Sequence, residues 1–492
     1  MERDADKKDG QGRLVLVGFV PHPPVMVPEV GRGQERQVEK TIQAMQRLGK
    51  ETAAAEPETL IVITPHGPVF QDAFAMAGGE ELRGNLWQFG AAGVAMRYPN
   101  DPALLHLIAE EAAKEGITAV VMDEKLARRF SVPVSLDHGV LVPLYFLRQG
   151  GVLSPQEAAK APGKSVGVRL VSIAYGFLPY DEVYAFGIAL QRAVRRSGKR
   201  VALIASGDLS HRLTPDAPAG YHPEGAAFDR RVCELTAAGD VEGFFQFTPR
   251  QVEKAGECGL RSFLVGWGAA DGCQISPQVY SYEGPFGVGY MVANLGVGEE
   301  DPGRRLLERL REGHRQILKA RRENEPFPVR LARQTVESFV KEGKRPSLPA
   351  EVPEEFERAA GVFVSIKKKG QLRGCIGTVY PMRGSVAEEI IENAISAAVR
   401  DPRFPPVAPE ELEDLEYSVD VLGDPEPVSG LEELDPVRYG VIVSSGQRRG
   451  LLLPDLEGVE TAEEQVSIAR RKAGISENEP VTLERFEVKR FK

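Results

Sequence analysis

Histidine is scarce in this chain of 492 residues, and its placement is uneven. Three of the seven histidines, His22, His66 and His211, come shortly after the end of an apolar run. Neutral imidazole is the most common protein ligand for transition metals, and it also exchanges protons near neutral pH. If the fold brings these histidines together, they predict a metal centre with acid–base chemistry beside it.

The apolar runs before these histidines have the composition of buried parallel strands. They span residues 14–20, 59–64 and 201–205 and are almost wholly apolar, as expected when helices cover both faces of a sheet. In open α/β sheets, ligands bind beyond the carboxyl ends of the strands, where these histidines fall. Prolines beside His22 and His66 restrict the backbone, as a preorganised site requires.

Two further residues are candidates for catalysis. His138 follows Asp137 at the expected start of a helix that continues to about residue 149. A helix N-terminus is expected to lower the pKa of a histidine, which suits His138 to act as a neutral hydrogen-bond donor or base. Asp208 lies in the segment SGDLSH that ends at His211, and we group it with the two catalytic histidines.

The third metal ligand is open at this point. Two histidines and one carboxylate leave positions on iron where dioxygen and an organic substrate can both bind. Glu257 and Cys258 are adjacent in the segment GECG, and Glu283 is a more distant candidate. Neighbouring residues of a helix diverge by about 100°, so Glu257 and Cys258 are not expected to reach one metal together.

The order of apolar and amphipathic segments predicts two domains. Strands alternate with helices over residues 14–295, which predicts an α/β domain with a mainly parallel or mixed sheet flanked by helices. Residues 296–328 are rich in Glu and Arg and predict a linker helix. Residues 329–492 mix strands and helices without a βαβ rhythm, which predicts an α+β domain. Residues 1–13 are charged and polar and are expected to be a disordered leader.

Composition excludes several classes of protein. The net charge of -10 argues against nucleic acid as a partner. No apolar run approaches the roughly 20 residues of a membrane helix, and no secretory signal is recognisable, so we expect no membrane association. The four cysteines are widely spaced, which argues against a disulfide framework and favours the reducing cytoplasm.

Four segments in the first domain resemble a known enzyme family. PHPP, TPHGP, DHG-x-x-x-PL and SGDLSH, in this order, are similar to the LigB-like family of class III extradiol dioxygenases and the related Memo family. The resemblance implies an Fe(II)-dependent oxidoreductase, with other divalent metals as alternatives, that opens a catechol-like or related aromatic substrate. It implies that His22 and His66 bind the metal, that His211 deprotonates the substrate hydroxyl, and that His138 donates a proton from outside the ligand set.

The segment GECG separates two functions. The dioxygenases have a glutamate in this region, so Glu257 as ligand favours an oxygenase. The Memo branch has a cysteine near this point, so Cys258 as ligand favours a Memo-like metal-binding protein without dioxygenase activity. The Memo-like hypothesis thus differs from the dioxygenase hypothesis in the third metal ligand, which is Cys258 instead of Glu257.

The second domain resembles the AMMECR family in two segments, LRGCIG at residues 372–377 and DPRFPP at 401–406. One hypothesis is an anion-binding pocket formed by Arg373 and Cys375 together with Asp401 and Arg403, in which the thiol tends toward the thiolate. The structural alternative is that Cys375 packs in the fold and Arg403 pairs with Asp401. A fusion of these two domains resembles the AmmeMemoRadiSam group, whose name implies a separately encoded radical SAM partner in the modification of another molecule.

Overall fold

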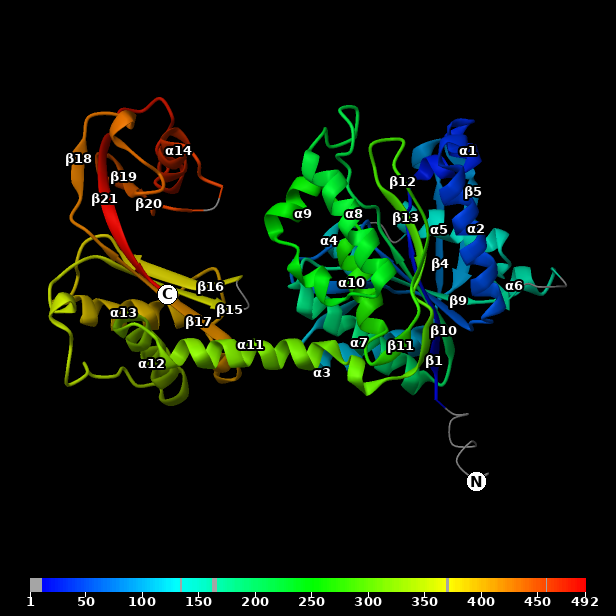
Figure 1. Ribbon diagram of the computed structural model, residues 1–492, viewed down its shortest axis with the longest axis horizontal. Helices are drawn as coiled ribbons and strands as arrows, with labels where there is room; N and C mark the ends of the chain where they lie inside the picture. The colour runs from blue at the N-terminus through cyan, green and yellow to red at the C-terminus, as the bar shows by residue number, and fades with distance from the viewer. Residues whose placement is uncertain (1–10, 133–134, 162–165, 369–370, 457) are drawn as a thin grey trace, which may run out of the picture. The chain divides into compact units, whose positions relative to one another are not determined.

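The computed structural model describes residues 11–132, 135–161, 166–368, 371–456 and 458–492. The chain forms two compact units, Met1–Leu310 and Arg311–Lys492, which are described separately here. In Figure 1 the first unit is coloured from blue to green and the second from yellow to red. None of the described helices is long and apolar enough to cross a membrane.

An eight-stranded mixed sheet forms the centre of the first unit. Its four inner strands run parallel to one another, in the order β1 (Arg13–Val20), β10 (Arg200–Ser206), β2 (Thr59–Thr64) and β9 (Arg169–Ala174). Beyond β1 the sheet continues through antiparallel pairing with β13 (Tyr290–Asn294) and then β12 (Gln278–Glu283). Beyond β9, β3 (Ala73–Ala77) pairs antiparallel, and β6 (Thr118–Met122) pairs parallel with β3. The predicted α/β class with a mixed sheet is confirmed.

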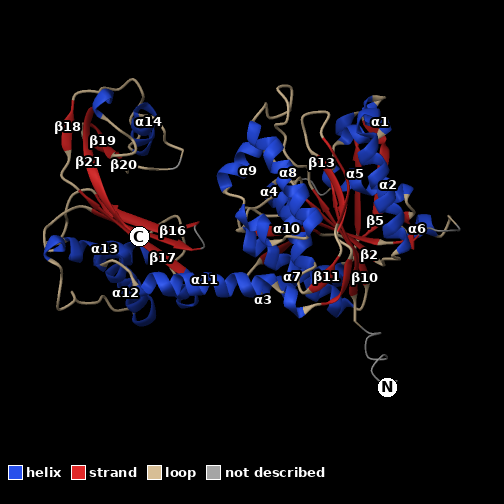
Figure 2. Cartoon of the chain, viewed as in Figure 1, coloured by secondary structure: helices blue, strands red, loops and turns tan. Residues whose placement is uncertain are grey.

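Helices cover both faces of this sheet (Figure 2). Neighbouring residues of β2 enter different cores: Leu60 packs in one apolar cluster and Ile61 in the other. The helices that contribute to the Leu60 cluster are α2 (Glu39–Ala54) and α5 (His138–Gln149). Those that contribute to the Ile61 cluster include α3 (Pro102–Lys114), α7 (Tyr180–Ser197) and α10 (Leu260–Ala269). Burial on both sides explains why the inner strands are apolar throughout.

The other helices and strands of the first unit are α1 (Pro28–Gly31), β4 (Glu81–Leu86), β5 (Ala91–Pro99), α4 (Glu124–Phe130), β7 (Val152–Leu153), α6 (Pro155–Ala158), β8 (Val166–Gly167), α8 (Pro223–Ala238), α9 (Pro249–Ala255), β11 (Cys273–Ile275) and β14 (Val297–Glu300).

Structure of the first unit includes residues from the segments expected to be the leader and the linker helix. Residues 1–10 of the leader lie outside the described residues, but the Gly12 N–H donates to Arg195 O (3.0 Å) and β1 begins at Arg13. On the linker side, β14 pairs with β11, and Leu306 at the start of α11 (Leu306–Glu323) is buried in the core of the first unit. The first unit therefore continues past residue 296, and the boundary between the units falls within α11.

The second unit has the predicted α+β composition, with a curled antiparallel sheet. Its strands are β15 (Val362–Lys368), β16 (Gln371–Thr378), β17 (Leu415–Leu422), β18 (Glu426–Val428), β19 (Tyr439–Ser445), β20 (Arg448–Leu452) and β21 (Thr482–Phe491), and its helices are α12 (Phe327–Glu342), α13 (Val386–Val399) and α14 (Ala462–Lys472). Val362, Val364 and Ile366 of β15 pack in the core with α12 and α13. The alternate side chains of β15 and β16 therefore lie on the other face of the sheet.

Candidate metal centre

The ends of the inner strands bring the predicted residues of the first unit together. His22 and His66 each lie two residues beyond a strand, and Asp208 lies two residues beyond β10. The strands end level, because Val20 of β1 pairs with Ser206 of β10 in the parallel register. Three loops thus leave the sheet at one edge, which is the ligand-binding edge of an open α/β sheet.

His22 is fixed with one ring nitrogen free for a metal. Its side chain is buried, and its Nδ1 lies 2.9 Å from Ser206 Oγ. The Ser206 hydroxyl donates its own hydrogen to Gly139 O (2.6 Å), so Ser206 Oγ accepts from the Nδ1–H of His22. Nε2 therefore carries the lone pair. A hydrogen bond of this kind to the distal nitrogen is what orients histidine ligands in metal sites.

His66 meets His22 at this lone pair. The two Nε2 atoms lie 2.9 Å apart, and the ring planes are inclined by 82°. Burial lowers the pKa of both imidazoles, and the proximity of His211 lowers the two pKa values further. Both rings are thus held in the neutral form that metal ions require of histidine.

Cys258 lies on another side of His22, in a group of possible donors with His22 and Asp208. Its Sγ lies 3.7 Å from His22 Nε2 and accepts a hydrogen bond from the Asp208 N–H at 3.2 Å. Burial raises the pKa of the Cys258 thiol well above its usual range, and the nearby carboxylates of Asp208 and Glu257 raise it further. The thiol is therefore neutral without a cation, and coordination to a metal would deprotonate it.

The adjacent Glu257 does not join this set. Its Oε2 accepts the N–H of Leu260 at 2.6 Å, so this carboxyl group caps the start of α10. Burial raises the pKa of Glu257 to about 7, while the hydrogen bond from Leu260 acts in the opposite direction. Glu283 is also engaged elsewhere, since its Oε1 accepts from the N–H and the hydroxyl of Thr41 at 2.8 and 2.6 Å. Of the three candidates, Cys258 is the one whose side chain lies near His22.

His138 lies against the two histidine ligands. Its ring stacks on His66 with the centroids 4.1 Å apart, and its centroid is 5.4 Å from that of His22. Burial lowers the pKa of His138 to about 3, helped by the two neighbouring imidazoles. His138 is thus a neutral donor or acceptor beside His22 and His66. A ligand role is also open to it, because one ring nitrogen each of His22, His66 and His138 lies within 4.8 Å of the others.

Asp208 and His211, both in the segment SGDLSH, contact different groups. Asp208 Oδ1 accepts the backbone N–H of His22 at 2.9 Å, and its Oδ2 lies 3.9 Å from His22 Nε2. Burial raises the pKa of Asp208 to about 6, although His22, His211 and His66 oppose this shift. The Nδ1 of His211 donates to Gly256 O at 2.6 Å, which leaves Nε2 as the basic nitrogen.

Two supporting residues were not among the sequence candidates. Ser206, which fixes the tautomer of His22, is the first residue of the SGDLSH segment, so only its role was missed. Asp229 on α8 accepts the N–H of Ser210 at 2.8 Å and the hydroxyl of Tyr282 at 2.7 Å, and thereby fixes the segment next to His211. No motif marks Asp229, because its partners come from distant parts of the chain.

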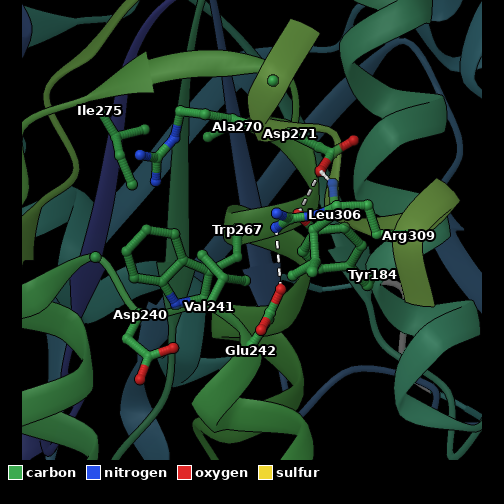
Figure 3. Close-up of a pocket in the computed structure, with 13 residues that line it drawn as sticks. Tyr184, Asp240, Val241, Glu242, Trp267, Ala270, Asp271, Ile275, Leu306 and Arg309 are labelled. Carbon is green, nitrogen blue, oxygen red and sulfur yellow. Dashed lines mark hydrogen bonds and ion pairs between the residues drawn. The ribbon is translucent and has the colours of Figure 1, made fainter. Parts of the chain in front are cut away.

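A separate cavity of about 230 Å³ in the first unit contains none of these residues. Figure 3 shows its lining, which includes Tyr184, Trp267 and Asp271. Most of its charged groups are already paired: Asp271 accepts from the Tyr184 hydroxyl at 2.7 Å, and Glu242 pairs with Arg309 at 3.0 Å. Trp267 Nε1 has no hydrogen-bond partner among the described residues. The geometry assigns this cavity no chemistry.

Three of the four residues predicted for the second-domain pocket lie together. Asp401 Oδ2 accepts the Cys375 N–H at 2.9 Å, and the Arg403 guanidinium binds both the Asp401 carboxylate and Cys375 O. Arg403 holds the pKa of Asp401 well below its usual range. Arg373 is turned away, since its guanidinium binds both oxygens of Glu411 at 3.1 and 2.8 Å.

Comparison with known families agrees with both halves of this description. Residues 16–293 match the family model of the catalytic LigB subunit of aromatic ring-opening dioxygenase. The chain belongs to the LigB family. Residues 329–492 match the AMMECR1 family model, so the predicted fusion of a LigB domain with an AMMECR domain is confirmed. The LigB family implies a bound metal, which is usually iron.

Some relatives match nearly the whole chain, and others match about a third of it. A protein of Clostridium acetobutylicum is 42% identical over 484 residues, which cover 97% of this chain and all of that protein. A protein of Thermotoga maritima is 54% identical over 167 residues, covering 33% of this chain and 96% of its own. The crystal structure of an uncharacterised protein from Pyrococcus horikoshii is 35% identical, covers 33% of this chain and 88% of its own, and has a TM-score of 0.31.

Proposed function

We propose that the LigB unit is a metal-dependent oxidoreductase that acts on a small hydroxylated aromatic substrate. His22, His66 and Cys258 would hold one transition-metal ion, with Fe(II) as the proposed metal. The observation that carries this proposal is the approach of two neutral histidines, the buried His22 and the more exposed His66, to 2.9 Å between their Nε2 atoms. His22 Nε2 carries a lone pair, and a cation bound by both imidazoles would take the place of the hydrogen between the two Nε2 atoms.

The two donor separations that involve His22 are those expected around a single ion. Metal–nitrogen bonds of about 2.0–2.1 Å and metal–sulfur bonds of about 2.3 Å, at angles of about 90–120°, put two ligands of one ion roughly 2.9–3.8 Å apart. The two Nε2 atoms are separated by 2.9 Å, and His22 Nε2 and Cys258 Sγ by 3.7 Å. Asp208 is a further donor candidate, since His22, Asp208 and Cys258 each offer an atom within 4.8 Å of the others.

The surrounding residues would handle protons. A bound metal would supply Lewis acidity, which lowers the pKa of a coordinated hydroxyl group. The Nε2 of His211 would accept the substrate proton, because its Nδ1 is committed to Gly256 O. His138 would remain neutral and donate or accept a hydrogen bond beside the substrate, since burial lowers its pKa to about 3.

A Memo-like function is the second candidate, and Cys258 favours it. The extradiol resemblance implies two histidines and a glutamate, whereas Glu257 caps α10 and Cys258 Sγ approaches His22. In this case the metal site would serve the modification of another molecule together with a radical SAM partner, without dioxygenase activity. Both functions share the metal centre and differ in whether dioxygen is consumed. The four cysteines, all free, support a cytoplasmic location for either function.

Oxygen uptake by anaerobically purified, iron-loaded protein distinguishes the two functions. With a panel of catechols, ring cleavage predicts uptake and a yellow ring-opened product. Replacement of His211 by alanine should lower the turnover number by about 10²–10⁴-fold, while the iron stays bound. Iron-loaded wild type that consumes no oxygen with any catechol would reject the first function and leave the Memo-like one. Protein that binds no metal would reject both.

A further inference from the structure

Tyr290, the first residue of β13, lies at the edge of the sheet where the histidine loops begin. β13 pairs with β1 in the antiparallel sense, with Ala293 opposite Phe19. The start of an antiparallel strand lies at the carboxyl end of its neighbour, so Tyr290 lies beyond the end of β1. The loop that carries His22 leaves the sheet at the same place.

The SGDLSH segment lies directly beside the start of β13. Gly289 donates its N–H to Ser210 O at 2.9 Å, and its own carbonyl accepts the Leu209 N–H at 2.9 Å. These two backbone hydrogen bonds place Tyr290 next to Asp208. In agreement with this position, burial raises the pKa of Tyr290, and the nearby carboxylate of Asp208 raises it further.

The side chain of Tyr290 lies on the face of the sheet that α5 covers. It packs in the same apolar cluster as Val140, which belongs to α5. His22 is held on this face as well, because Ser206, which accepts from its Nδ1–H, donates to Gly139 O of α5. Tyr290 and His22 therefore lie on one face of the sheet, at the same edge.

The hydroxyl of Tyr290 has no hydrogen-bond partner among the described residues, although Tyr290 is only 2% exposed. Other buried tyrosines of this unit do have one: the Tyr175 hydroxyl donates to Cys258 O at 3.2 Å, and the Tyr98 hydroxyl donates to Val152 O at 3.4 Å. An unpaired hydroxyl in a protein interior is unfavourable. Because the raised pKa keeps Tyr290 neutral, its hydroxyl is a donor available to a bound molecule.

We propose that the Tyr290 hydroxyl donates a hydrogen bond to an oxygen atom of the aromatic substrate bound at the metal centre. This inference rests on the proposed oxidoreductase function and adds a substrate-binding residue to it. The acceptor would be the ring oxygen that has given its proton to His211, because a charged oxygen accepts a stronger hydrogen bond than a neutral one. Tyr290 thus favours substrates whose ring hydroxyl ionises on binding.

Anaerobic titration of the iron-loaded, full-length protein with 4-nitrocatechol tests this role, because the absorption of this probe changes when it ionises. Tyr290→Phe removes the hydroxyl and keeps the ring. Its dissociation constant for 4-nitrocatechol should be about tenfold or more above that of the wild type, as expected for the loss of a hydrogen bond to a charged acceptor. Iron content should stay the same. The thermal midpoint without the probe should not fall, since the hydroxyl has no partner in the protein.

Tyr98→Phe is the matched control. Tyr98 is fully buried in the same apolar cluster, but its hydroxyl is bound to Val152 O, so the change should leave the affinity for 4-nitrocatechol unaltered. Equal affinity in wild type and Tyr290→Phe would overturn the role of Tyr290 and leave the proposed function standing. A lower thermal midpoint of probe-free Tyr290→Phe would also overturn it, by showing a structural partner. Iron-loaded wild type that binds no 4-nitrocatechol would overturn the aromatic substrate and this inference together.

Discussion

The Nε2 atoms of His22 and His66 lie 2.9 Å apart, although the two residues are 44 positions apart in the chain. Parallel pairing through β10, which lies between β1 and β2, brings the two loops to the same edge of the sheet. Ser206 at the end of β10 then fixes the tautomer of His22. The metal centre thus depends as much on the strand between the ligands as on the ligands themselves.

Ser206→Ala should weaken metal binding without removing a ligand. The change deletes the acceptor for His22 Nδ1–H and the donor to Gly139 O, so the His22 ring loses its fixed tautomer. Loss of such an outer contact costs about 10–100-fold in metal affinity. Competition with a chromophoric chelator measures the effect. Ser262→Ala is the matched control, because Ser262 is equally buried and its Oγ has no described partner; unchanged affinity in Ser206→Ala would contradict the role of Ser206.

Cys258→Ser should lower the metal content, whereas Glu257→Ala should lower the stability of the fold. Cys258→Ser removes the thiol that lies 3.7 Å from His22 Nε2, so the variant should lose most of its metal while keeping its thermal midpoint without metal. Glu257→Ala removes the acceptor for the Leu260 N–H at the start of α10 and should cost about 1 kcal/mol of stability. Metal analysis and thermal unfolding of both variants check this. Loss of metal only in Glu257→Ala would show that the carboxylate is the ligand.

The second unit should lose stability in acid through Glu411. Burial acts to raise the pKa of Glu411, but hydrogen bonds from Arg373, the Ala408 N–H and Lys368 outweigh it and lower the pKa to about 2. A carboxyl whose pKa is lower in the folded than in the unfolded chain stabilises the fold above the unfolded pKa. That contribution, on the order of 2–3 kcal/mol for a shift of this size, fades as the pH falls from about 4.5 toward 2.

Glu411→Gln tests this dependence. At pH 7 the variant should unfold at a lower temperature than the wild type in calorimetry, and the difference should shrink at pH 3. Both tryptophans, Trp87 and Trp267, belong to the first unit, so tryptophan fluorescence would report on the other unit and serves as the internal control. A difference between wild type and variant that is as large at pH 3 as at pH 7 would exclude this role of the ion pair.

The inner strands could be predicted from the sequence because each is buried on both faces. The run at residues 59–64 coincides with β2, and the run at 201–205 lies within β10. The hairpin of β4 and β5 was not predicted, since its strands alternate buried and exposed residues irregularly around Gly84 and a short 3-10 helix at Trp87–Phe89. A strand is easy to recognise from its sequence where both of its faces are buried, and hard to recognise where it is half exposed.

The candidate site could likewise be predicted only in part from the sequence. His22, His66 and His211 were predictable because each follows a recognisable strand. The choice between Glu257 and Cys258 was not, because it depends on which side chain caps α10, and both residues suit either role.

Metal content after anaerobic purification tests the proposed centre most directly. Wild-type protein should contain about one equivalent of transition metal, and so should His106→Ala, whose histidine is exposed on α3. The double variant His22→Ala/His66→Ala should contain almost none while keeping a folded circular dichroism spectrum. Stoichiometric metal in the double variant would contradict the assignment of these two histidines as ligands.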